Sequence, residues 1–136
     1  MFRAISFIVW GTENRHRYLR SLVVRHIENS WRELKPFVVA EWSMSSLDDY
    51  IGFMGADGTF ASELECVVAT KLNRLNLAIY RRVEGSDALR RILYSQYSGS
   101  ARTANLLFSG HNEYGHYDVL EPVGSASPSF VSSYLP

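Results

Sequence analysis

The chain of 136 residues has a single cysteine, Cys66, so it cannot form an internal disulfide. It has no net charge, because 14 basic residues balance 14 acidic ones, and this argues against general electrostatic binding to nucleic acid or an anionic membrane. It also lacks a signal-peptide pattern and any apolar run near the roughly 18 residues that span a bilayer. We therefore expect a monomeric protein of the cytoplasm or nucleus, with no nucleic acid or membrane as partner.

What the sequence does contain is a helical hydrophobic pattern through its first half. Apolar residues recur at the spacing of one buried helical stripe and arginines take the other face, which predicts an amphipathic helix. We expect His26 to lie in the core on this stripe, and we expect His16 to lie at the surface. The apolar stripe consists of Leu19, Leu22, Val23, His26 and Ile27. The polar face consists of Arg17, Arg20, Arg25 and Glu28.

Three further helices are predicted from start and stop signals. Residues 30–37 read as a short helical turn that Pro36 ends, because proline lacks the amide that would continue the helix. Ser46 is typical of an N-cap for a helix through Met54. Ser62, with Glu65 three residues later, fits a capping box at the start of a helix that runs to about residue 72.

From residue 75 the apolar period changes to two, which indicates strands. We predict strands at 75–80, 92–97, 105–108 and 116–120, separated by loops rich in glycine, serine and arginine. The predicted class is α+β, with helices packed on a small, mostly antiparallel sheet. After Pro122 the composition turns to glycine, serine and proline, so we expect one domain over residues 1–122 and a flexible tail with few contacts over 123–136.

The stretch HNEYGHYDVLEP carries the strongest chemical signal. Side chains two apart share a face of a strand, so His116 and Asp118 can hydrogen-bond. An acid that holds one imidazole nitrogen fixes the tautomer and makes the other nitrogen a better base for a thiol or hydroxyl nucleophile. The spacing alone leaves a second interpretation open, in which His116 is an ordinary strand residue and Asp118 a solvated neighbour.

Other candidate groups favour structural roles. Cys66 lies inside a predicted helix between Glu63 and Glu65, which disfavours its thiolate, so we interpret it as a buried structural residue. His111 lies near His116, but the chain has no His-x-x-x-His or Cys-x-x-Cys pair, so we predict no metal site. We interpret the basic cluster of Arg81, Arg82, Arg90 and Arg91 as solvated strand edges and not as an RNA site.

Several stretches together resemble the OTU (ovarian tumour) family of cysteine proteases, which are mostly deubiquitinases. MFRAIS at residues 1–6 resembles the family's D-G-x-C-[LM]-F-R-[AS]-[IVL] after its cysteine, and KPF at 35–37 resembles a later helix exit. GTFASELE at 58–65 resembles the family's G-T-W-G-G-E-x-E-L, and LNLAIYRR at 75–82 resembles one of its strands. GHYDVL at 115–120 resembles the family's closing motif, N-H-Y-[DN]-x-[VL]. The motifs occur in the family's order over residues 1 to about 120.

The resemblance implies an OTU-like fold and a cysteine protease that hydrolyses isopeptide bonds of ubiquitin or a ubiquitin-like protein. It assigns His116 as the general base and Asp118 as the acid that orients it, and it implies no metal or organic cofactor. Met1 falls directly after the position of the nucleophilic cysteine, so we expect the chain as written to be inactive. The alternative is a non-catalytic pseudoenzyme that binds ubiquitin or another protein partner.

Overall fold

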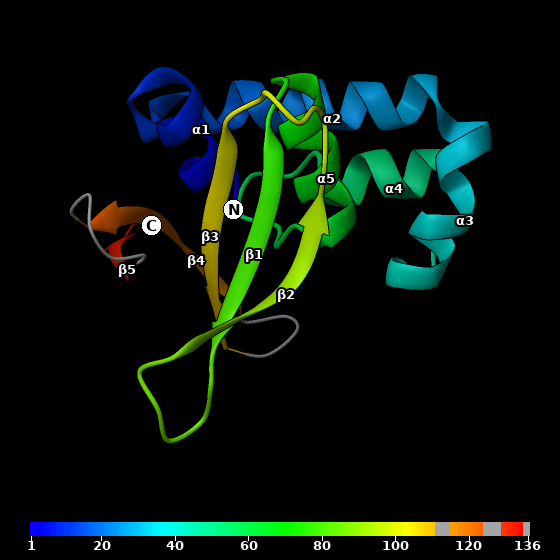
Figure 1. Ribbon diagram of the computed structural model, residues 1–136. Helices are drawn as coiled ribbons and strands as arrows, with labels where there is room; N and C mark the ends of the chain where they lie inside the picture. The colour runs from blue at the N-terminus through cyan, green and yellow to red at the C-terminus, as the bar shows by residue number, and fades with distance from the viewer. Residues whose placement is uncertain (111–114, 124–128, 135–136) are drawn as a thin grey trace.

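Five helices precede five strands in the computed structural model, which describes residues 1–110, 115–123 and 129–134 (Figure 1). A short 3-10 turn, η1, lies between the first two helices. The helices are α1 (Phe2–Trp10), α2 (His16–Asn29), α3 (Trp31–Trp42), α4 (Leu47–Met54) and α5 (Glu63–Leu72), and η1 covers Glu13–Arg15. The strands are β1 (Asn76–Arg82), β2 (Leu89–Ser95), β3 (Thr103–Ser109), β4 (His116–Val123) and β5 (Ser129–Tyr134).

The strands form one mixed sheet in the order β2-β1-β3-β4-β5. β1 and β3 are parallel, and the other three neighbouring pairs are antiparallel. The register of β1 against β2 shifts between Ile79 and Tyr80, and such a bulge increases the local twist. The predicted α+β class with a mostly antiparallel sheet is confirmed.

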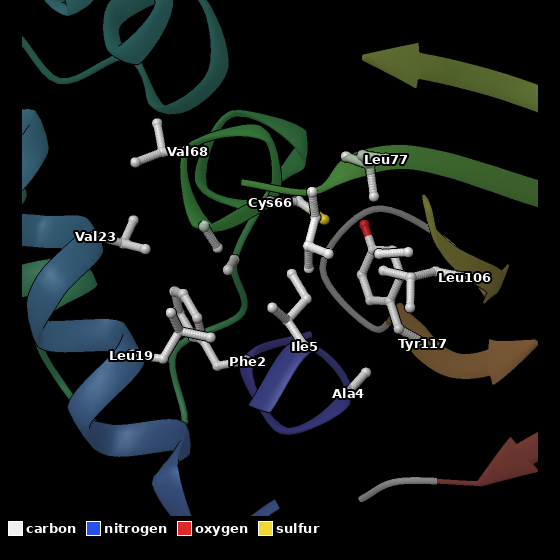
Figure 2. Packing of buried hydrophobic residues seen from close by; sticks show 14 of the residues in the cluster. Phe2, Ala4, Ile5, Leu19, Val23, Cys66, Val68, Leu77, Leu106 and Tyr117 are labelled. Carbon is white, nitrogen blue, oxygen red and sulfur yellow. The ribbon is translucent and has the colours of Figure 1, made fainter. Parts of the chain in front are cut away.

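The main core lies between the sheet and the helices α1, α2 and α5. Apolar side chains from all three helices meet those of β1, β3 and β4, as Figure 2 shows. Burying this apolar surface is the principal favourable term for folding. The labelled members of the cluster are Phe2, Ala4, Ile5, Leu19, Val23, Cys66, Val68, Leu77, Leu106 and Tyr117.

Two of the predicted helices differ from the structure. α3 continues through Pro36 to Trp42, where we expected a short turn, because the buried Val38 anchors its second half in the core. On α2 the buried stripe is rotated, so that His16 is buried and His26 is only half-buried, the reverse of our expectation. The buried face of α2 is made of His16, Leu19, Arg20, Val23, Val24 and Ile27.

The C-terminal segment also differs from the expected tail. The backbone of Ser129–Tyr134 pairs with β4 in antiparallel register, from Val123 opposite Ser129 to Asp118 opposite Tyr134. Phe130, Val131 and Tyr134 have high strand propensity, and pairing covers the edge that β4 would otherwise expose. The sheet therefore extends beyond the boundary that we expected at residue 122.

Candidate active site

The structure brings together the two side chains that the sequence singled out. His116 begins β4, and His116 Nε2 lies 3.0 Å from Asp118 Oδ1. The His116 side chain is 33% exposed and that of Asp118 only 14%, so the imidazole can meet a solute while the acid is largely shielded. Because Nε2 is directed at the carboxyl group, this contact holds the imidazole ring in one orientation.

His116 lines a cleft of about 400 Å³ where four segments of the chain meet. The segments are the start of α1 with Met1 and Phe2, one face of α2 with His16 and Arg20, the loop of residues 57–61 before α5, and the start of β4 with Gly115. α1 also contacts β3 and β4 directly, so this helix packs against the strand that carries His116. The full lining is Met1, Phe2, Arg3, His16, Arg20, Asp57, Gly58, Thr59, Phe60, Ala61, Gly115, His116 and Tyr117.

A buried arginine holds one wall of this cleft. Arg20 donates from Nη1 to the Met54 carbonyl at 2.8 Å and from Nη2 to the Thr59 carbonyl at 2.7 Å. Its guanidinium also lies 4.6 Å from the ring centre of Phe2, so one side chain of α2 joins the start of α1 to the 57–61 loop. Burial lowers the pKa of this guanidinium. We expected Arg20 on the polar face of the helix, although its position continues the spacing of His16, Leu19 and Val23.

The same loop is fixed from its other end by the capping box of α5. Glu65 Oε1 accepts from both the backbone amide and the hydroxyl of Ser62, each at 2.7 Å. Glu65 Oε2 accepts from the Tyr50 hydroxyl at 2.8 Å. Glu65 is fully buried, and the capping box predicted from the sequence is confirmed.

Comparison of the chain with known protein families and structures agrees with this arrangement. The sequence profile of a family described as OTU-like cysteine protease matches residues 1–117. The chain belongs to this family. It is similar to the OVARIAN TUMOR DOMAIN-containing deubiquitinating enzyme 7 of Arabidopsis thaliana, with 30% identity over 82 residues, which cover 60% of the chain and 21% of that protein. The chain therefore spans about a fifth of the length of this relative.

Solved OTU domains share the fold. The OTU domain of OTUD1 matches with a TM-score of 0.67 and 23% identity, covering 87% of this chain and 75% of that chain. The viral OTU domain protease from Qalyub virus matches with a TM-score of 0.62 and 18% identity, covering 85% and 74% of the two chains. The OTU-like fold that the sequence motifs implied is confirmed.

Cys66 is a buried residue of the core. Its side chain is fully buried in α5, and in Figure 2 the sulfur points into the core between α5 and the strands. Burial raises the pKa of the thiol to about 12, and the carboxyl groups of Glu63 and Glu65 act in the same direction. The thiol is therefore protonated near neutral pH and cannot act as the nucleophile.

Phe60 stands where the OTU motif has a tryptophan, and it is one of the residues that line the cleft. It stacks on Tyr117 with the ring centres 6.4 Å apart and the planes 18° apart. Tyr117 also contacts Phe108, with ring centres 5.1 Å apart. We call Phe60, Phe108 and Tyr117 the aromatic column. It supports the strand on both sides of His116.

A further candidate from the sequence, His111, lies outside the described residues. Among residues 1–110, 115–123 and 129–134, no group of three His, Cys, Asp or Glu side chains is placed to hold a metal ion. No helix in the described part of the chain is long and apolar enough to cross a membrane.

Proposed function

We propose that this OTU domain is a cysteine-protease module for isopeptide bonds of ubiquitin or a ubiquitin-like protein. The observation that carries the proposal is the 3.0 Å pairing of His116 Nε2 with Asp118 Oδ1 in the cleft that the first residues of α1 also line. The names of the Arabidopsis relative and of the viral domain support the substrate class and the reaction.

The reaction uses His116 twice as a proton carrier. A thiol supplied directly before Met1 loses its proton to His116, and the thiolate attacks the carbonyl carbon of the terminal glycine of the modifier. The imidazolium returns the proton to the leaving lysine amine as the C–N bond breaks, which leaves a thioester. His116 then takes a proton from water, the hydroxide attacks the thioester, and the thiol is regenerated. Asp118 holds the ring and stabilises the imidazolium.

The decisive experiment supplies the thiol. The element Asp-Gly-Asn-Cys is joined directly before Met1, which puts a cysteine at the start of α1, where the helix dipole and His116 favour the thiolate. We expect the extended chain to cleave a fluorogenic ubiquitin C-terminal amide. The 136-residue chain itself should cleave nothing and should stay unlabelled by ubiquitin with a thiol-reactive C-terminus, because its one thiol is buried.

Two variants of the extended chain test the assigned roles. His116→Ala should lower kcat/KM about a hundredfold to ten-thousandfold, the range typical of general-base catalysis. Asp118→Ala should lower it less, because Asp118 only orients and stabilises the ring. A folded extended chain that cleaves no ubiquitin-like substrate would refute the proposal, and binding without cleavage would favour a non-catalytic binding module. Rapid labelling of Cys66 would contradict its structural role.

A further inference from the structure

Arg81 connects β1 to the aromatic column that supports His116. Arg81 follows Ile79 by two residues and so shares its face of β1, toward the helices. Its guanidinium carbon lies 5.1 Å from the ring centre of Phe108, a distance at which a cation is attracted to an aromatic face. The contacts continue from Phe108 to Tyr117 and from Tyr117 to Phe60.

The same guanidinium holds the backbone at the end of β3. Arg81 Nη2 donates a hydrogen bond to the carbonyl of Gly110, the residue that follows β3. Gly110 has a φ of 100°, a left-handed conformation that favours glycine, so the chain changes direction there. Arg81 therefore fixes both the ring of Phe108 and the carbonyl at the point where the chain leaves β3.

The position of Phe108 determines where the residues around His116 can lie. A Cβ at Gly115 would lie 2.7 Å from Phe108 Cζ and 2.9 Å from Phe60 Cε2, so the two rings enclose the backbone directly before His116. In the sheet Phe108 pairs with Tyr117, directly after His116. A displacement of the Phe108 ring would therefore reach both neighbours of His116.

We propose that Arg81 is a positioning residue for His116. By clamping Phe108 and the Gly110 carbonyl, it holds the start of β4 so that the imidazole stays within reach of Asp118 and faces the cleft. An effect of Arg81 on catalysis rests on the proposed function, but its effect on the position of the imidazole does not. We expected Arg81 to be a solvated edge residue; its contacts with Phe108 and Gly110 instead tie β1 to the end of β3.

The first test uses the 136-residue chain and requires no activity. Long-range ¹H–¹⁵N spectra, recorded at a pH where the ring is neutral, report which nitrogen of His116 carries the proton. In the parent chain we expect the Nε2–H form, because Nε2 lies at the carboxyl group of Asp118. The ¹⁵N chemical shifts of His116 in Asp118→Ala define the signature of a ring that lacks the Asp118 partner. Arg81→Ala should shift the ¹⁵N signals at least halfway to that signature in a chain that is still folded.

Two matched variants separate positioning from a general effect on the fold. Arg81→Lys keeps the charge and a donor for Gly110, so it should retain most of the parent signature. Arg82→Ala removes the neighbouring exposed arginine of β1 and should leave the signature unchanged. An Arg81→Ala spectrum like that of the parent, or an equal shift in Arg82→Ala, would overturn the proposal.

The second test uses the chain extended by Asp-Gly-Asn-Cys. Misplacement of a catalytic group by about 1 Å can cost on the order of a hundredfold in rate. We therefore expect Arg81→Ala to lower kcat about tenfold to a hundredfold with KM within about threefold of the parent, and Arg82→Ala to change neither. An unchanged kcat in Arg81→Ala would contradict the proposal. If the extended chain cleaves nothing, the proposed function fails, and the spectra of the 136-residue chain still decide the role of Arg81.

Discussion

At the scale of single residues, the cleft depends on a position that has no side chain. Gly115 precedes His116 and lies against the rings of Phe108 and Phe60 at distances that leave no room for a methyl group. The glycine thus allows the aromatic column to approach the backbone that carries the His116–Asp118 pair. Sequence alone gives no reason for a glycine here, because the reason lies in rings from two other segments.

We predict that Gly115→Ala destabilises the protein. Overpacking of this kind typically costs about 1 to 3 kcal/mol, because rings must shift to make room. Gly52→Ala is the matched control, since Gly52 lies in α4 with open space around its Cα and a helical alanine is about 1 kcal/mol better than glycine. Urea unfolding of both variants gives the free energies. Equal changes in the two would show that packing at Gly115 is loose.

The residues of the site differ in how far the sequence could predict them. His116 and Asp118 are two apart on a strand, so their pairing follows from local geometry and could be predicted. Arg20 and Arg81 could not be predicted in the same way, because the carbonyl groups that accept their hydrogen bonds lie 29 to 39 residues away in the sequence. A polar residue that the fold buries against distant carbonyls has the same local signature as a solvated one.

At the scale of elements, the start of α5 is the best-defined junction near the cleft. The Ser62 amide and hydroxyl and the Tyr50 hydroxyl all donate to the Glu65 carboxyl group, which is fully buried. The Ser62 and Glu65 part is local and was predictable as a capping box. The hydrogen bond from the Tyr50 hydroxyl to Glu65 joins α4 to α5 and could not be predicted from the local sequence. The continuation of α3 through Pro36 likewise depends on packing that a local rule does not include.

We predict that Glu65→Ala costs about 3 kcal/mol or more, because it leaves buried donors of Ser62 and Tyr50 without an acceptor. Glu65→Gln retains an acceptor of similar size and should cost about 1 to 2 kcal/mol. Tyr50→Phe removes one donor and leaves the cap intact, so it should resemble Glu65→Gln. Urea unfolding at neutral pH measures all three. A Glu65→Ala protein as stable as Glu65→Gln would show that the buried network contributes little.

At the scale of the whole molecule, groups that ionise only at high pH are packed into one core. Burial raises the pKa of Cys66 to about 12, from an ordinary value of 9.0. Burial also raises the pKa of Tyr50 and of Tyr117 well above the ordinary 10.0, and the carboxyl group of Glu65 adds to the effect at Tyr50. These residues come from α4, α5 and β4, so their protonation is linked to the stability of the entire fold.

The linkage predicts a loss of stability in alkali. Above pH 9 the unfolded chain releases the Cys66 proton while the folded chain keeps it, so the free energy of unfolding should fall as pH rises from 9 toward 12. The two tyrosines should steepen the fall above pH 10. Each proton contributes at most about 1.4 kcal/mol per pH unit. Cys66→Ala should therefore flatten the fall of the unfolding free energy between pH 9 and 10, whatever constant amount the lost packing costs.

Val68→Ala is the control, because it is a buried change on the same helix without a titrating group. It should lower stability and leave the pH slope as in the parent. Urea unfolding at half-unit pH steps measures these slopes, and the same slope in Cys66→Ala and the parent would show that the thiol does not contribute to the alkaline loss.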